Sequence, residues 1–297
     1  MSSLFDRLVL TLDMIKFEHS VFALPFALTG ALLAFREDHF ATSNPWWKLA
    51  WIVAAMIGAR SAAMTFNRIL DADIDGRNPR TAARHLPAGI LSSRFAWAFL
   101  LVTSTLFLLA ARMLNPLCFY LAPVALAVVF FYSFTKRFTP MAHLVLGFAL
   151  GIAPSAAWIA VRGSYDVRML WMTAAVTLWT AGFDIIYSCQ DFEFDGREGL
   201  FSLPTRFGIS GALWIARALH VLMIVSLAAL IVGFALGWLA WLGVAVIVAL
   251  LLYEHRLVRA DDLSRVDAAF FTVNGYVSVL FFVFWASDIF LLGRGSF

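Results

Sequence analysis

Two groups of acidic side chains share one spacing, and each suits a hard metal ion. In the first acidic motif, Asn67, Asp71 and Asp75 lie at positions i, i+4 and i+8. A continuous helix lines such positions along one face. Carboxylates aligned in this way repel each other unless a cation neutralises them. Oxygen ligands without a nearby His or Cys suit Mg²⁺ rather than zinc or copper, so the motif predicts a Mg²⁺ site.

The second acidic motif repeats the phase of the first with Tyr187, Asp191 and Asp195. Four expected helices separate the two motifs, which indicates an internal duplication of helices 1–4 and 5–8. Magnesium is commonly held by one or two carboxylates together with substrate phosphates. Two facing carboxylate pairs therefore predict a diphosphate site bridged by metal ions. Acids at helix ends can also be simply solvated and ion-paired, an alternative that explains one such cluster better than two of matched spacing.

Basic residues close to both motifs could bind the remaining diphosphate oxygens, since guanidinium groups contact phosphate in a bidentate way. These residues are Arg77, Arg80, Arg84, Lys136, Arg137 and Arg206. Each of them could equally be a topology determinant, because cytoplasmic loops of membrane proteins are rich in Lys and Arg.

The composition is that of a membrane protein. Of the 297 residues 62% are hydrophobic and 14% are charged, whereas a soluble domain carries about 25% charged residues. An ordinary cytosolic enzyme, a disordered chain and a nucleic-acid binder are excluded. The net charge of +3 is then expected to report orientation in the membrane rather than a polyanionic partner.

Uncharged runs predict nine membrane-spanning helices, since one span takes roughly 20 apolar residues. They cover residues 20–35, 49–66, 95–111, 114–135, 141–161, 169–190, two helices within 217–254 that join between Gly233 and Gly237, and 268–287. Residues 4–16 have helical spacing of apolar side chains and predict a short interfacial helix. The whole chain, residues 1–297, is expected to form a single membrane-embedded domain.

Lys and Arg concentrate in the loops that lie on the side of the N-terminus, and this asymmetry predicts a cytoplasmic N-terminus. Both acidic motifs then face the cytoplasm. The expected location is the cytoplasmic (inner) membrane of a bacterium.

Two charged residues lie inside predicted spans, each seven residues before an acidic motif. Arg60 precedes Asn67, and Asp184 precedes Asp191. Because an unpaired charge in a membrane is costly, an Arg60–Asp184 ion pair is one hypothesis. The other is that Arg60 binds a substrate carboxylate while Asp184 orients a ring hydroxyl or acts as a base.

Several of these segments together resemble the signatures of the UbiA superfamily of intramembrane prenyltransferases. They are Asn67-Arg68-x-x-Asp71-x-x-x-Asp75, Arg80-Thr81-x-x-Arg84, Leu86-Pro87-x-Gly89, Tyr132-Ser133-Phe134-Thr135-Lys136-Arg137, and Tyr187 with Asp191-x-x-x-Asp195. The family commonly has Asp directly after the Asn, where this chain has Arg68.

The resemblance implies a nine-helix bundle around a central cavity that opens to lipid. Mg²⁺ on the diphosphate of a polyprenyl donor would be held by Asp71, Asp75, Asp191 and Asp195, aided by Asn67. The leaving diphosphate would be neutralised by Lys136, Arg137, Arg80 and Arg84, with Tyr187 beside them. Metal and cations would stabilise the negative charge as the allylic C–O bond breaks. The allylic cation would then alkylate a small aromatic acceptor, in a dry cavity within membrane lipid.

The acceptor is less closely defined. Residues 15–27 resemble both 4-hydroxybenzoate polyprenyltransferases and the naphthoate prenyltransferases of the futalosine route to menaquinone. The first, a ubiquinone-pathway activity, is the expectation, with 1,4-dihydroxy-6-naphthoate as the alternative acceptor. An ion or metal transporter and a CDP-alcohol phosphotransferase are alternatives of other classes. Transporters place ion ligands near the bilayer midplane, however, and the Asp/Gly pattern of the phosphotransferases does not occur around Asp71 or Asp191.

Overall fold

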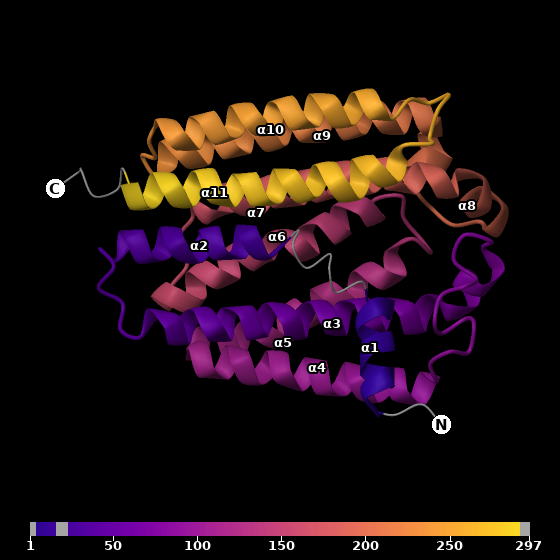
Figure 1. Ribbon diagram of the computed structural model, residues 1–297, viewed down its shortest axis with the longest axis horizontal. Coiled ribbons are helices and arrows are strands. Elements are labelled where there is room, and N and C mark those ends of the chain that lie inside the picture. Colours follow the sequence, from indigo (N-terminus) through magenta and orange to yellow (C-terminus); the bar gives the residue numbers. More distant parts are fainter. Residues whose placement is uncertain (1–3, 16–22, 292–297) are drawn as a thin grey trace. The chain divides into compact units, whose positions relative to one another are not determined.

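The computed structural model describes residues 4–15 and 23–291, and its regular elements are helices of several kinds (Figure 1). The chain forms two compact units, which we describe separately. Unit 1 comprises Met1–Ser20 and Ala50–Phe134, and unit 2 comprises Val21–Leu49 and Thr135–Phe297.

The all-helical, multi-span architecture expected from the sequence is confirmed. Within the described residues eight helical segments are long and apolar enough to cross a membrane. They are α3 (Pro45–Arg77), α4 (Ser93–Leu114), α5 (Pro116–Thr135), α6 (Ala142–Arg162), Met169–Glu198, α9 (Leu203–Gly233), α10 (Trp238–Leu257) and Ala268–Leu291. The shorter α2 (Leu24–Glu37) corresponds to the first predicted span, so the expected count of nine holds approximately.

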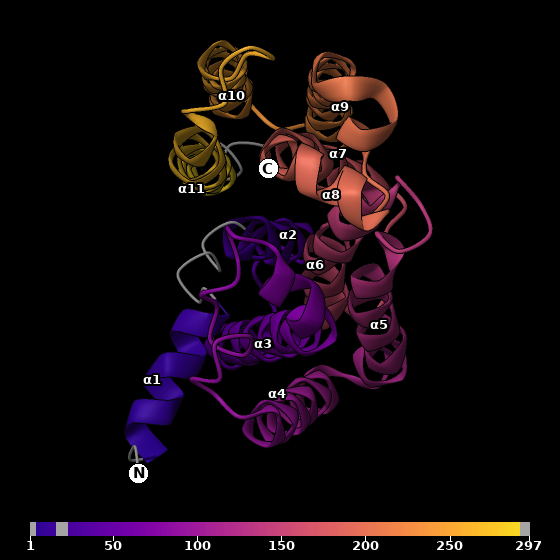
Figure 2. The same cartoon turned by 90° about the vertical axis from the view of Figure 1, so that its right-hand side faces the viewer.

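Unit 1 contains α1 (Leu4–Met14), most of α3, α4 and α5, and Figure 2 shows α3 and α4 nearly end-on. The backbones of α3 and α4 touch, because a Cβ added at Gly58 would lie 2.9 Å from the Phe107 nitrogen. Small residues permit such close approach of membrane helices. The helix α3 ends at Arg77, directly before Asn78-Pro79, where the proline disfavours a helical conformation of the preceding residue.

Unit 2 is built around α7 (Met169–Ser188), which packs between α6 and α9. The helix α2 lies against α6 and α11 (Asn274–Leu291), and α11 in turn packs on α10 (Figure 1). Glycines allow the closest contacts: a Cβ at Gly147 of α6 would lie 2.2 Å from the Thr177 carbonyl oxygen of α7. The position of α7 is therefore set by backbone contact as well as by side chains.

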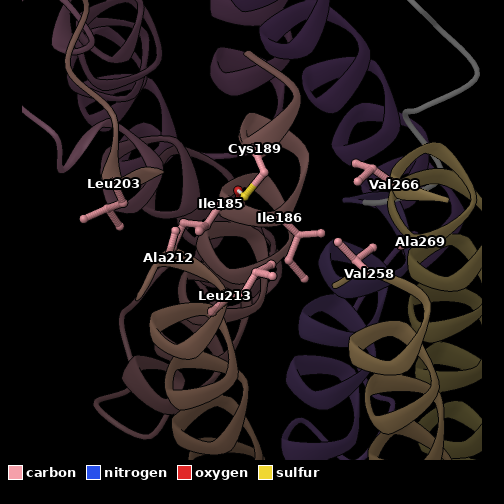
Figure 3. Close-up of a cluster of buried hydrophobic side chains, with 10 residues drawn as sticks. Ile185, Ile186, Cys189, Leu203, Ala212, Leu213, Val258, Val266 and Ala269 are labelled. Carbon is pink, nitrogen blue, oxygen red and sulfur yellow. Dashed lines mark hydrogen bonds between the residues drawn. The ribbon is translucent and has the colours of Figure 1, made fainter. Parts of the chain in front are cut away.

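A buried apolar cluster fixes the end of α7 that carries the second acidic motif (Figure 3). Its members come from α7, the start of α9 and the connection between α10 and α11: Ile185, Ile186, Cys189, Leu203, Ala212, Leu213, Ala216, Val258, Val266 and Ala269. All of them are almost completely shielded from solvent. Three segments that are distant in the sequence are thus joined directly beneath the motif.

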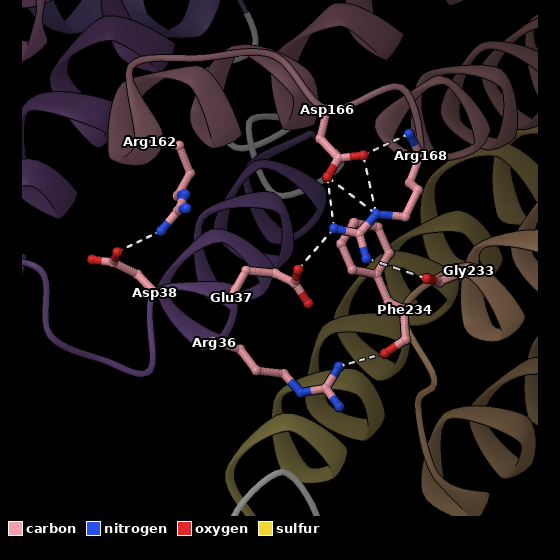
Figure 4. Close-up of polar contacts among 8 residues, drawn as sticks. All are labelled: Arg36, Glu37, Asp38, Arg162, Asp166, Arg168, Gly233 and Phe234. Carbon is pink, nitrogen blue, oxygen red and sulfur yellow. Dashed lines mark hydrogen bonds and ion pairs between the residues drawn. The ribbon is translucent and has the colours of Figure 1, made fainter. Parts of the chain in front are cut away.

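A polar network ties together the opposite end of unit 2 (Figure 4). The Arg168 guanidinium donates to the Glu37 carboxylate at 2.7 Å and to the Gly233 carbonyl at 3.3 Å. It also lies 4.1 Å from the ring centroid of Phe234. Arg162 pairs with Asp38 in the same region. These contacts link the ends of α2, α6 and α9 to the start of α7.

Arg168→Gln is expected to lower the thermal stability of the protein at neutral pH. Hydrogen bonds from Arg168 hold the pKa of the Asp166 carboxyl below its ordinary value. A lowered pKa in the folded state stabilises the protein above the unfolded-state pKa of about 3.9, and this stabilisation is lost as pH falls through the folded-state value. The measurement is the melting temperature in detergent at pH 7 and pH 3. If the melting temperature falls by the same amount from pH 7 to pH 3 in the wild type and in Arg168→Gln, the prediction is contradicted.

Candidate active site

The first acidic motif lies on one uninterrupted face of α3, as the spacing predicts. Asn67, Asp71 and Asp75 are all buried, whereas the neighbouring Asp73 is exposed. The Asn67 side-chain amide donates to the Asp71 carboxylate at 3.1 Å. The helix therefore turns Asn67, Asp71 and Asp75 inward and leaves Asp73 in solvent.

Two arginines in unit 1 contact the last carboxylate of this motif. The Nη1 atom of Arg84 lies 2.8 Å and 2.7 Å from the two oxygens of Asp75. Arg68 is more distant, with its Nη1 atom 4.0 Å from Asp75. Arg68 thus adds a positive charge to the first motif at the position where the family commonly has Asp.

The loop after α3 folds back on the motif through Thr81 and Asn78, neither of which was predicted as a site residue. The buried Thr81 hydroxyl donates to the Asp75 carbonyl at 3.0 Å, and the Asn78 side chain accepts from the Arg80 backbone N–H at 2.9 Å. These bonds bring Arg84 back over the end of the helix. The Asn78-Pro79 pair, a turn signal, could have indicated this loop.

The second acidic motif lies on a broken helix. After α7 the chain makes a 3₁₀ turn, η2 (Cys189–Asp191), and continues as α8 (Phe192–Glu198). The Ser188 hydroxyl and the Cys189 thiol both donate to the Ile185 carbonyl, while the Cys189 backbone N–H bonds to Ile186. This competition from side chains explains the tighter turn. Tyr187, Asp191 and Asp195 are half-buried, but no single α-helix carries all three.

Lys136 is held close to the second motif. Its carbonyl accepts a hydrogen bond from the Phe201 N–H at 2.8 Å, which joins the chain after α5 to the loop between α8 and α9. Its ammonium charge acts favourably on the Asp195 carboxylate. Ser202, which caps α9, also acts favourably on the charged Asp195 carboxylate. One lysine of the predicted cation set is therefore positioned by the backbone.

The remaining predicted cations lie at the surface. Arg77, Arg80, Arg137 and Arg206 are all exposed. A charged substrate can reach these exposed side chains from solvent, so their positions suit its recruitment.

Asp184 pairs with a residue of unit 2 that the sequence did not indicate. Its carboxylate lies 2.7 Å from Nδ1 of His143, which is almost fully buried in α6. Nε2 of this imidazole is 3.5 Å from the Leu203 backbone N–H. The two contacts together assign the Nδ1 proton to the bond with Asp184. A separation of 41 residues gives no local signal for this pair.

Arg60 lies half-buried on α3, within unit 1, and interacts electrostatically with Tyr132 near the end of α5. Arg68 interacts with the same phenol. Tyr132 belongs to the helix-end segment that carries the family resemblance, and it is a further polar residue near the first motif.

The donor set fits Mg²⁺ only with help from a substrate. Among residues 4–15 and 23–291, no three His, Cys, Asp or Glu side chains come close enough together to hold a metal ion by themselves. Each motif instead offers two carboxylates with a cation nearby. That arrangement matches a magnesium ion that takes its other ligands from substrate phosphates and water.

Comparison with known proteins identifies the family of the chain. The family model of the UbiA prenyltransferase family matches residues 23–287. The chain is 30% identical over 242 residues to 4-hydroxybenzoate octaprenyltransferase of Vibrio atlanticus, covering 80% of this chain and 84% of the relative. It is 32% identical over 242 residues to the protein of the same name from Citrobacter koseri, covering 80% and 81%. Of the segment 15–27 that resembles these enzymes, residues 16–22 lie outside the described structure.

Solved structures share the fold. A UbiA homologue from Aeropyrum pernix K1, determined in its apo form, superimposes with a TM-score of 0.82 at 34% identity, covering 92% of this chain and 98% of that one. A UbiA homologue from Archaeoglobus fulgidus, bound to GPP and Mg²⁺, has a TM-score of 0.74 at 18% identity, covering 94% and 99%. The family model and the curated relatives favour a prenyltransferase over the transporter and phosphotransferase alternatives. The chain is an integral multi-pass membrane protein and belongs to the UbiA prenyltransferase family.

Proposed function

We propose that the chain transfers a polyprenyl group from a polyprenyl diphosphate to 4-hydroxybenzoate and releases diphosphate. The main observation in support of this reaction is that the two motifs have the same arrangement of charged groups. Each places two carboxylates at the end of a helix and a cation beside the second carboxylate, Arg84 at Asp75 and Lys136 at Asp195. The names of the curated relatives support the choice of acceptor.

Asp71, Asp75, Asp191 and Asp195, with Asn67, are the residues that would hold Mg²⁺. When bound, the ion supplies positive charge that makes the diphosphate a better leaving group. The homologue bound to GPP and Mg²⁺ supports this choice of metal.

The basic residues then bind the leaving group. As the allylic C–O bond breaks, its electron pair stays on the diphosphate oxygen. Lys136 and Arg84 act on that charge from their positions beside the motifs, and Arg80 and Arg137 reach it from the surface. If Asp75 held the ion, its oxygens would no longer bind Arg84, and the guanidinium would be available to the phosphate.

The aromatic ring attacks the allylic carbon and afterwards loses its ring proton. We propose that Arg60 binds the acceptor carboxylate, and that Asp184 orients the ring hydroxyl. The 2.7 Å contact between Asp184 and His143 supports the role of Asp184, because it gives this carboxylate a partner that fixes its orientation. The alternative remains an ion pair between Arg60 and Asp184.

Arg60→Gln is expected to raise KM for the acceptor at least 10-fold and to leave KM for the donor unchanged. A guanidinium–carboxylate contact is charge-assisted, and its loss weakens ground-state binding of the acceptor alone. Steady-state kinetics with one substrate varied at a time provides the measurement. Recovery of a folded protein in Arg60→Asp only when Asp184→Arg is added would instead establish the ion pair.

We further propose that the chain lies in a bacterial cytoplasmic membrane with its N-terminus and both acidic motifs on the cytoplasmic side. The concentration of Lys and Arg in the loops on that side supports this orientation. Labelling of single cysteines in those loops from outside intact cells would contradict it.

The function is tested by incubating membranes that contain the protein with Mg²⁺ and a polyprenyl diphosphate. Parallel reactions contain 4-hydroxybenzoate or 1,4-dihydroxy-6-naphthoate, and mass spectrometry detects the prenylated product. Product from 4-hydroxybenzoate, dependent on Mg²⁺, is the expected result. Product from the naphthoate alone would assign the enzyme to menaquinone biosynthesis and refute 4-hydroxybenzoate as the acceptor.

A further inference from the structure

A fully buried amide in unit 2 satisfies three polar groups from three different segments. The Asn274 side chain accepts a hydrogen bond from Trp179 Nε1 at 2.7 Å and donates to Glu254 Oε1 at 2.8 Å. It also donates to the Ala269 carbonyl at 3.1 Å. Asn274, Trp179 and Glu254 are all completely shielded from solvent. Because the partners of an amide fix which end is oxygen and which is nitrogen, Asn274 has a single orientation here.

Asn274 stands directly after an unusual stretch of backbone. Ala268–Val273 forms a π-helical turn, η3, and α11 begins at Asn274. π-Helical turns are rare in proteins, and many of those that do occur lie at functional sites. The bond from the Asn274 side chain to Ala269 spans this turn from its end to its second residue. The amide therefore fastens the π-helical turn to α7 through Trp179 and to α10 through Glu254.

The π-helical turn presents two phenylalanines to α7. The Phe270 ring lies 4.2 Å from that of Tyr187 and 5.2 Å from that of Phe183, measured between centroids. Phe271 packs at right angles to Phe270 at 4.7 Å and lies 6.0 Å from Tyr187. These four rings, Phe183, Tyr187, Phe270 and Phe271, form what we call the aromatic group.

The aromatic group leads directly to the second acidic motif. Trp179, Phe183 and Tyr187 follow one another at intervals of four residues on α7, and Tyr187 is itself the first residue of the second acidic motif. The faces of aromatic rings attract cations, and the attraction is stronger where water is excluded. Rings held beside the site of diphosphate departure can therefore stabilise an allylic cation and keep water away from it.

We propose that Asn274 is a positioning residue for prenyl transfer, because it holds the π-helical turn so that the aromatic group shields the allylic cation from water. The inference rests on the proposed role of Asp191 and Asp195 in holding the donor diphosphate. When the C–O bond breaks, the diphosphate leaves with the electron pair. The cation then has two fates: attack by the acceptor ring followed by loss of a ring proton, or attack by water to give a prenyl alcohol and a proton.

The ratio of prenyl alcohol to transfer product tests the proposal. A substitution that merely lowers the amount of folded protein reduces both products together and leaves their ratio unchanged. Asn274→Leu keeps the branching and the number of heavy atoms of the side chain but removes all three hydrogen bonds. We expect this variant to raise the ratio at least 10-fold, with kcat for transfer reduced and donor consumption partly retained. Reactions use geranyl diphosphate, Mg²⁺ and the acceptor that yields product in the assay above.

Three further variants make the result decisive. Glu254→Gln retains an oxygen acceptor for Asn274 and is expected to keep the wild-type ratio. Trp179→Phe removes one bond and should raise the ratio less than Asn274→Leu does, which also provides the test if Asn274→Leu does not fold. Asp288→Asn is the matched control, since Asp288 is buried on the same helix and binds the Gly237 and Ala240 N–H groups at its other end. Its ratio should not change.

An unchanged ratio in both Asn274→Leu and Trp179→Phe would refute the positioning role. If the proposed function itself is wrong, the result differs: Asp191→Ala would then still consume donor at the wild-type rate.

Discussion

Asp191→Ala is expected to lower kcat about 10³-fold, with both prenyl transfer and donor hydrolysis affected. Loss of one group that stabilises developing negative charge typically costs this much, and a metal bound by few carboxylates depends on each of them. Asp71→Ala in the first motif should have an effect of the same order. Turnover is measured in detergent or vesicles over a range of Mg²⁺ concentrations, after size-exclusion chromatography has shown that each variant is folded.

Each motif supplies its own control. Glu193 is an exposed neighbour of Asp191 that pairs with Arg197, and Asp73 is an exposed neighbour of Asp71 on the same helix. Alanine at Glu193 or Asp73 removes an equal charge from almost the same place and should leave kcat within about 2-fold, since surface ion pairs contribute little. Substantial activity in Asp191→Ala or Asp71→Ala would overturn the mechanism with two acidic motifs.

Gly147→Ala should destabilise the protein by about 2–3 kcal/mol, a large effect for one methyl group. The new Cβ would lie 2.2 Å from the Thr177 carbonyl oxygen and 3.3 Å from the Ala181 nitrogen. Both atoms belong to the backbone of α7, so no side-chain rotation relieves the clash and the helices must separate. Unfolding of the purified protein in mixed micelles, by titration with a denaturing detergent, measures the free-energy change.

Gly196→Ala is the matched comparison for this prediction. Gly196 also lies within a helix, α8, but nothing lies within 4 Å of a Cβ added there. Alanine is favoured over glycine inside helices, so this variant should be neutral or slightly more stable. Equal stability of Gly147→Ala and Gly196→Ala would show that α6 and α7 are not in backbone contact at Gly147.

Regular spacing made the first motif predictable. Asn67, Asp71 and Asp75 share a buried face because α3 continues without a break from Pro45 to Arg77, as the absence of proline and the pattern of the run suggest. The turn between α9 and α10 was equally accessible, since Gly233 and Gly237 interrupt an apolar stretch too long for one crossing. In both cases the information is local.

Features that depend on competition between partners were not predictable. The 3₁₀ turn after α7 arises because Ser188 and Cys189 bond to a carbonyl that a continuous helix would use. The π-helical turn before α11 depends on Asn274 and on partners far away in the sequence. From the sequence alone neither Trp179 nor Glu254 could be identified as a partner of Asn274.

The length of α3 has a consequence for how the enzyme meets its donor. At roughly 1.5 Å per residue the stretch from Pro45 to Asn67 is about 33 Å long, close to the ~30 Å hydrocarbon core of a bilayer. With Pro45 at one boundary of the hydrocarbon core, the first motif would begin at the other boundary, close to where a donor anchored by its tail would carry its diphosphate. The enzyme and its donor would then meet by lateral diffusion within the plane of the membrane. Saturation should follow the mole fraction of donor among the lipids: diluting the vesicles in buffer leaves turnover unchanged, whereas adding plain lipid to the same bilayers lowers it.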